Sequence, residues 1–249
     1  MKHLPWALAV LILAVFILPE QALGLQLPEL TLDFTGDDQP EQVSVLLQIL
    51  FLLTVLSVAP AIVLMTTSFV RIVIVLSFIR QAMGTQQMPP NQVIIGLALF
   101  LTFFIMAPVL GRINSEAIQP YLQQEIGDKQ ALTLAIEPMR EFMFEQVREK
   151  DLQLLVDITQ SEPPQTRQDI DTLALVPAFM LSEIKRAFQI GFMIFIPFLV
   201  IDMVTASVLM SMGMLMLPPI IISLPFKVLL FVLVDGWHLV VQSLVQSFV

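Results

Sequence analysis

The chain has 249 residues, of which 57% are hydrophobic and only 13% are charged, and its formal net charge at pH 7 is −9. This composition predicts a membrane-embedded protein, and the acidic balance argues against nucleic-acid binding, which needs a basic surface. With no cysteine and only two histidines, the chain cannot form disulfides or thiolate-ligated metal sites, so we expect no metal and no cofactor.

The first 24 residues, MKHLPWALAVLILAVFILPEQALG, have the pattern of a secretory signal peptide. Lys2 supplies a positive start, Trp6 to Leu18 form an apolar core, and Ala22 to Gly24 offer small residues for cleavage. The alternative is an uncleaved membrane helix, but the apolar run is short for a span and Pro19 follows it at once. Cleavage would start the mature chain near Leu25, outside the cytoplasm.

The next part of the chain changes from acidic to apolar. Residues 25–42 contain five acidic and no basic residues, which predicts an exposed, loosely ordered lead-in. Residues 43–110 hold the N-terminal apolar helices, with apolar runs at 43–65, 69–79 and 93–110. The first of these runs carries no charge and is long enough to span a bilayer.

Residues 111–172 have the composition of a water-exposed domain, with twelve acidic and six basic residues. Ile136, Met139, Met143 and Val147 recur at steps of three and four, which predicts an amphipathic helix. We therefore expect a small helical domain outside the membrane, in preference to a solvated loop.

Residues 173–249 return to apolar sequence and predict a helical hairpin, with one arm over 187–212 and the other over 220–248. Between the arms lies MSMGMLMLPP, residues 210–219, in which Gly213 and two prolines break the helix. Methionines occupy every second position of this tip: Met210, Met212, Met214 and Met216. Side chains at this spacing diverge in a helix but share one side of an extended segment.

Several charged residues lie in or against the apolar helices, where an ionised group is costly unless it faces protein, a partner or water. They are Arg71, Glu183, Lys185, Arg186, Asp202, Lys227 and Asp235. Asp202 precedes a tip near residue 215 by 13 positions and Lys227 follows it by 12. The two can therefore pair, within one subunit or across to a neighbour. We expect Glu183, Asp202 and Lys227 to form charge pairs between subunits.

Two other classes of function fit an apolar chain with internal charges. An intramembrane aspartyl protease could use Asp202 and Asp235, but the helical rise places these carboxylates at different heights of the hairpin. An ion-coupled transporter also carries intramembrane charges, but this chain lacks the repeated halves of that class.

Four long motifs carry a family resemblance. The segments TSFVRIVIVLSFIRQAMGT, PPNQVIIGLALFLTFFIMAPV, PAFMLSEIKRAFQIGFMIFIPFLVIDMV and PFKVLLFVLVDGWHLVVQSL resemble the FliP family, the flagellar branch of the type III secretion export-gate proteins. The resemblance covers about residues 43–110 and 173–248. The signal peptide and the sizeable external domain are typical of the flagellar branch; the alternative is the export gate of a virulence type III secretion system.

The resemblance implies an all-α, non-enzymatic pore subunit in which membrane-associated helical hairpins and a small external domain assemble into a helical ring. It implies five copies in a stack with FliQ and FliR, assembly assisted by FliO, and a machine completed by FlhA and FlhB. This gate would pass unfolded flagellar subunits across the bacterial inner membrane at the flagellar basal body, with the external domain in the periplasm. The family's methionine-rich tips ring the pore as a gasket, and the matching residues here are Met210, Met212, Met214 and Met216.

Overall fold

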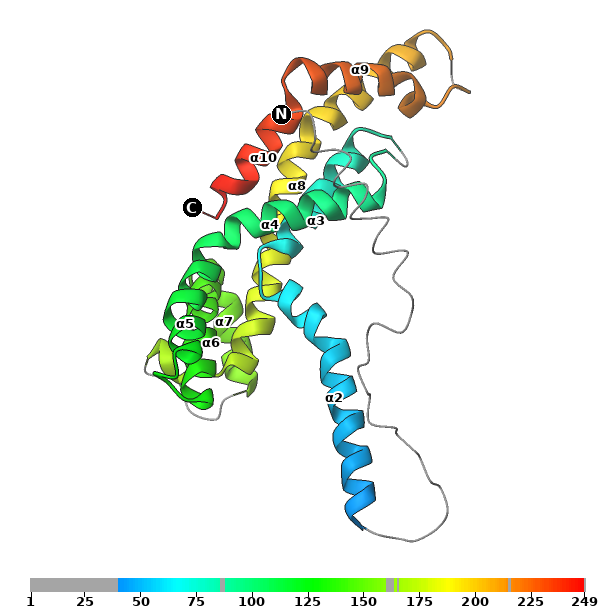
Figure 1. The fold of residues 1–249 in the computed structure, drawn as a ribbon. Coiled ribbons are helices and arrows are strands. Elements are labelled where there is room, and N and C mark those ends of the chain that lie inside the picture. The colour runs from blue at the N-terminus through cyan, green and yellow to red at the C-terminus, as the bar shows by residue number, and fades with distance from the viewer. Residues whose placement is uncertain (1–39, 86–87, 160–163, 165, 215, 249) are drawn as a thin grey trace, which may run out of the picture. The chain divides into compact units, whose positions relative to one another are not determined.

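The computed structural model describes residues 40–85, 88–159, 164, 166–214 and 216–248, and the regular elements in these ranges are all helices (Figure 1). This confirms the predicted all-α class; assembly into a ring around a pore stays a prediction. The expected signal peptide and nearly all of the acidic lead-in lie outside the described residues. By its internal contacts the chain divides into residues 1–51 and 52–249, and the packing described below belongs to the second unit.

The elements follow one another in a simple order along the chain. They are α2 (Pro40–Met65), α3 (Phe69–Ala82), α4 (Asn91–Ile113), the π-helical turn η1 (Asn114–Ile118), α5 (Gln119–Leu122), α6 (Asp128–Gln146), α7 (Glu149–Thr159), the 3₁₀ turn η2 (Arg167–Asp169), α8 (Thr172–Ser211), α9 (Pro219–Leu233) and α10 (Gly236–Gln246).

Helix α3 lies at the centre of the first apolar core. Its buried residues Ile72, Val75, Leu76 and Ile79 recur at the spacing of one helix face, and this face packs along α8. The two helices approach closely at Gly191 of α8, where an added Cβ would stand only 2.7 Å from the ring of Phe78. A glycine at this position therefore sets the distance between α3 and α8.

A second core joins α6 and α7 to the first turns of α8 and to Met106 of α4. The predicted amphipathic helix is α6, with Met143 buried and Met139 and Val147 packed at the edge of this core. Ile136 is 40% exposed, whereas Phe142 is 7% exposed. The apolar face of α6 is therefore rotated toward Phe142 relative to the predicted stripe.

The membrane-like character of the chain rests on long apolar helices. Among the residues that the structure describes, two of them, Asn91–Leu122 and Thr172–Ser211, are long and apolar enough to cross a bilayer, and the number rises to four if each of two bent helix pairs is a single span. One bent pair joins α2 to α3 at 67° and the other joins α9 to α10 at 64°. The composition-based expectation of a membrane protein fits these helices.

The two arms of the hairpin differ from the sequence prediction in their bounds. The first arm, α8, begins at Thr172 and not near residue 187, because Asp171 caps it there by accepting from Leu173 N, and Glu183, Lys185 and Arg186 are residues that favour a helix. The second arm is broken after Val234, where Asp235 adopts a left-handed φ of 52°. Gly236 permits this bend, since a Cβ there would stand 2.3 Å from the ring of Phe231.

Candidate functional site: the methionine-rich hairpin tip

The hairpin tip presents its methionines at the surface of the chain. Helix α8 ends at Ser211 and α9 begins at Pro219, and Gly213 turns the chain with a φ of 75°, a conformation that glycine adopts without steric cost. The exposed fractions of the four methionines are 59% for Met210, 67% for Met212, 40% for Met214 and 97% for Met216. These large apolar side chains are therefore free to contact a partner.

Only part of the tip lies outside the helices. Met210 belongs to the last turn of α8 and Met212 follows directly as its C-cap, whereas Met214 and Met216 lie in the non-helical connection. Leu215 lies outside the described residues. Met214 and Met216 are therefore the two methionines that the helices do not hold, and that all four share one side of the tip stays a prediction.

A polar cluster bridges the two arms below the tip. Lys227 Nζ of α9 donates to Asp202 Oδ2 of α8 at 2.6 Å, and Ser223 Oγ donates to Asp202 Oδ1 at 2.5 Å. The turn after α3 lies against this cluster, because a Cβ at Gly84 would stand 3.9 Å from Lys227 Nζ. The Lys227 side chain is 4% exposed and that of Asp202 is 24% exposed. Both carboxylate oxygens of Asp202 are therefore occupied by donors from the other arm.

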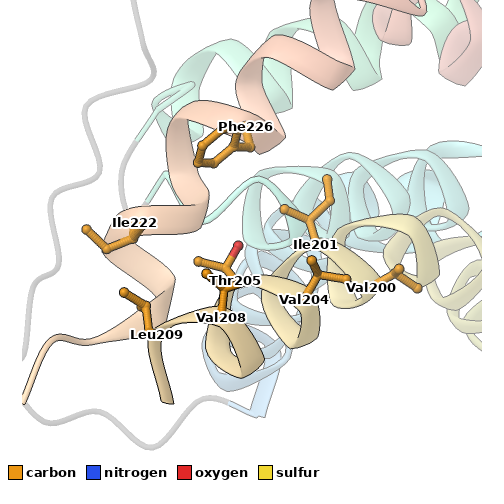
Figure 2. Close-up of a pocket in the computed structure, with 8 residues that line it drawn as sticks. All are labelled: Val200, Ile201, Val204, Thr205, Val208, Leu209, Ile222 and Phe226. Atoms are coloured by element: carbon orange, nitrogen blue, oxygen red, sulfur yellow. The ribbon is translucent and has the colours of Figure 1, made fainter. Parts of the chain in front are cut away.

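An apolar cavity of about 480 Å³ lies between the same two arms (Figure 2). Six side chains of α8 between Val200 and Leu209 face Ile222 and Phe226 of α9, and the hydroxyl of Thr205 is the one polar side-chain group among these lining residues. A site of this composition suits an apolar group and offers no charge for catalysis or for ion binding.

Glu183 lies in a separate buried cluster. It accepts from Arg71 Nε at 2.9 Å through Oε2, and its Oε1 accepts from Arg71 Nη2. Both side chains are 0% exposed. This bidentate ion pair allows both charges to be buried, because the guanidinium donates to both oxygens of the carboxylate and the opposite charges compensate each other.

The structure thus gives Glu183, Asp202 and Lys227, the three residues expected to pair, a partner within one chain. For Asp202 and Lys227 it shows the within-subunit alternative, and for Glu183 it shows Arg71, which the sequence analysis had singled out only as a charge in an apolar helix. Pairing between subunits stays a prediction. Each Asp202 oxygen accepts one donor and keeps a second lone pair, and the side chain is exposed enough to accept a further donor from a neighbouring copy, whereas Glu183 is not.

The two residues of the alternative protease function, Asp202 and Asp235, have different surroundings. Asp202 is engaged by Lys227 and Ser223, whereas Asp235 is exposed at the start of α10. In the part of the chain that the structure describes, there is no group of three or more His, Asp or Glu side chains that could hold a metal ion. The four methionines and the polar cluster remain the candidate functional features.

Comparison with known proteins places the chain among flagellar proteins. The model of the FliP family matches residues 52–244. The flagellar biosynthetic protein FliP of Bacillus subtilis (strain 168) is 60% identical over 215 residues, which cover 86% of this chain and 97% of that protein. The protein of the same name from Caulobacter vibrioides is 52% identical over 236 residues, covering 95% of this chain and 87% of that protein. The one from Pectobacterium carotovorum is 55% identical over 201 residues, covering 81% and 78%.

Proposed function

The chain belongs to the FliP family and is a component of flagellar type III protein export, and from this premise we propose that it is a pore-forming core subunit of the export gate. The observation that carries the proposal is the exposure of the methionines at the tip of the α8–α9 hairpin. A soluble or lipid-embedded turn has no need to gather flexible thioether side chains at a single exposed point.

The tip would act as a gasket when several copies surround one axis. Methionine is apolar, unbranched and adaptable, so a ring of such side chains can close on itself and later reshape around a passing polypeptide. An apolar constriction excludes water and ions by dewetting. In this arrangement Met210, Met212, Met214 and Met216 would keep the membrane sealed while unfolded flagellar subunits pass.

Assembly with other subunits is supported by the amount of apolar surface that one chain leaves uncovered. Leu52, Leu53 and Leu56 of α2 are 64%, 56% and 67% exposed, and contiguous apolar surfaces of this kind are typical of protein or membrane contacts. We propose five copies in a stack with FliQ and FliR, with FlhA and FlhB as further partners and FliO as an assembly factor.

The location follows from the distribution of charge. We propose that the long apolar helices lie at the bacterial inner membrane in the flagellar basal body, and that the acidic domain of residues 111–172 lies in the periplasm. Glu183, Asp202 and Lys227 would support subunit contacts, with Asp202 the one whose exposure leaves room for a donor from the neighbouring copy. The flagellar names of the relatives favour this branch over a virulence export gate.

Co-purification tests the proposed role. Expression of this chain with FliQ and FliR, followed by detergent extraction and native mass spectrometry, should give one particle that contains several copies of this chain and both partners. A particle that contains a single copy of this chain, under conditions that preserve the other two subunits, contradicts the proposal.

A further inference from the structure

The guanidinium of Arg71 is a meeting point of four helical elements. Its Nε and Nη2 donate to Glu183 of α8, Nη2 also donates to Gln146 Oε1 of α6 at 3.0 Å, and Nη1 donates to Ser247 just beyond α10. Ser247 accepts twice, through its carbonyl oxygen at 2.7 Å and its hydroxyl oxygen at 3.0 Å. Arg71 itself is 0% exposed.

The cluster has two parts: the Arg71–Glu183 ion pair, which is complete by itself, and the C-terminal segment at Ser247, which can separate from that pair. The Arg71–Glu183 pair already joins the two buried charges by two hydrogen bonds. Burial of the guanidinium therefore does not require Ser247, which adds neutral acceptors from a segment 176 residues away in sequence. Hydrogen bonds from the guanidinium to these neutral acceptors contribute less than the pair of two opposite charges, so the C-terminal segment can leave, with water replacing Ser247 at Nη1, while the pair stays intact.

Gln146, the last residue of α6, contacts both the Arg71–Glu183 pair and the C-terminal segment of residues 247–248. It thereby connects helices α6 and α7 to both. Its Oε1 accepts from Arg71 and, at 2.7 Å, from Arg186 Nη1, while its Nε2 donates to the carbonyl oxygen of Phe248 at 3.3 Å. The amide thus uses its acceptor side on the two arginines and its donor side on the C-terminal segment. A carboxylate, which only accepts, could not fill both roles at once.

The ring of Phe248 completes the contact. It lies under Arg71 with 3.7 Å between the guanidinium carbon and the ring centroid, and it stacks on Phe142 of α6 at 6.3 Å between centroids. Phe248 packs against both apolar cores of the protein. One aromatic side chain therefore links the core around α3 and α8 to the core around α6 and α7.

From these contacts we infer that residues 247–248 form a latch. Through this latch, helices α6 and α7 hold the end of α10 and, with it, the second arm of the hairpin. Gln146 is the positioning residue that closes the latch by donating to the carbonyl oxygen of Phe248. Arg71 and Phe142 are the residues against which Phe248 packs. The α9–α10 arm carries the tip at one end and the latch at the other, so opening the latch would free the end of α10 from helices α6 and α7. This inference stands without the proposed pore role.

The variant Gln146→Glu separates closing the latch from supporting the fold. A carboxylate at this position still accepts from Arg71 and Arg186 but cannot donate to Phe248, and it repels the carbonyl oxygen of that residue. Hydrogen exchange of the full-length chain in detergent should show amides at the end of α10 exchanging about fivefold faster, which corresponds to the loss of one ordinary hydrogen bond. The amides of α3 and of the middle of α8 should keep their wild-type rates.

The reciprocal variant, Phe248→Ala, tests whether the coupling runs both ways. It should raise exchange at the C-terminal turn of α6, 102 residues away in sequence, through loss of the ring under Arg71 and beside Phe142. The matched control is Gln242→Glu, the same chemical change at an exposed position of α10, which should change neither region.

Three results would overturn the latch. The first is unchanged exchange of α6 in Phe248→Ala, which would make the contact local to α10. The second is unchanged exchange at the end of α10 in Gln146→Glu. The third is a uniform rise across α3 and α8 in either variant, which would make these residues general supports of the fold.

Discussion

Lys227 Nζ lies 2.6 Å from Asp202 Oδ2, although the two residues are 25 positions apart and sit on opposite arms of the hairpin. The ammonium is almost fully buried among apolar side chains, where an unpaired charge is strongly unfavourable. The pair therefore fixes the register of the two arms, and the register determines where the methionine tip stands.

Reversing one charge of this pair should disrupt assembly. In Lys227→Glu two carboxylates face each other, and breaking a buried pair typically costs about 3–5 kcal/mol. We expect the variant chain to be absent from the complex with FliQ and FliR on native gels. Lys185→Glu, a reversal at an exposed position of α8, should assemble normally.

The double variant Asp202→Lys with Lys227→Glu, compared with co-expression of the two single variants, separates the two kinds of pairing. Partial recovery of the complex by the double variant, without recovery on co-expression of the single variants, is the result that the within-chain contact predicts. Recovery on co-expression of the two single variants would instead show pairing between subunits, as the sequence led us to expect. Full assembly of Lys227→Glu alone would contradict both.

The contact of α3 with α8 should be intolerant of a methyl group at one glycine. Gly191→Ala places a Cβ 2.7 Å from the Phe78 ring, and overpacking of this kind costs about 1–3 kcal/mol. At Gly96 of α4 a Cβ meets nothing within 4 Å, so Gly96→Ala should be neutral or stabilising by up to about 1 kcal/mol. Thermal unfolding of the two variants in detergent gives the comparison; equal melting temperatures would refute the close approach.

Helix α6 should lose stability in acid through Glu141. Its hydrogen bond with the Arg112 guanidinium lowers the pKa of the Glu141 carboxyl below its ordinary value. A lowered pKa stabilises the folded state above the ordinary pKa of about 4.3, and this contribution disappears as the pH falls through the folded-state pKa. Glu141→Gln should therefore flatten the pH dependence of thermal unfolding below about pH 4.3. Glu145→Gln, on the same helix, is the matched control, and an identical pH profile for the two variants would refute the contribution of Glu141.

The mature protein should lack its first residues. The positive start, short apolar core and small residues before Leu25 predict cleavage by signal peptidase. N-terminal sequencing of protein extracted from membranes should begin near Leu25. A sequence that begins at Met1 would mean that this segment stays in the mature chain.

Helical content and the hairpin could be predicted from the sequence because they depend on local pattern. Apolar runs, Gly213 and the paired prolines place the arms and the tip without knowledge of tertiary contacts. The same symmetry of spacing about the tip brought Asp202 level with Lys227, and the two are in contact.

The features that could not be predicted depend on contacts between distant segments. Arg71 and Glu183 are 112 residues apart, and no periodicity relates them. Their pairing lets both charges be buried within the apolar core, so Glu183 marks no boundary of α8, which begins after its N-cap Asp171. The bend at Asp235 likewise depends on Gly236 fitting against the Phe231 ring, a packing requirement that a lone glycine does not reveal.

The pore role is tested most directly by the double variant Met214→Ala with Met216→Ala, which removes the two methionines of the non-helical tip and leaves both arms unchanged. Cells that express the assembled variant complex should leak ions across the inner membrane, because alanine is too short to close the opening. Replacing Met203, an exposed methionine on α8 away from the tip, should leave the membrane sealed. An assembled double variant with a sealed membrane and undiminished flagellar export would contradict the gasket.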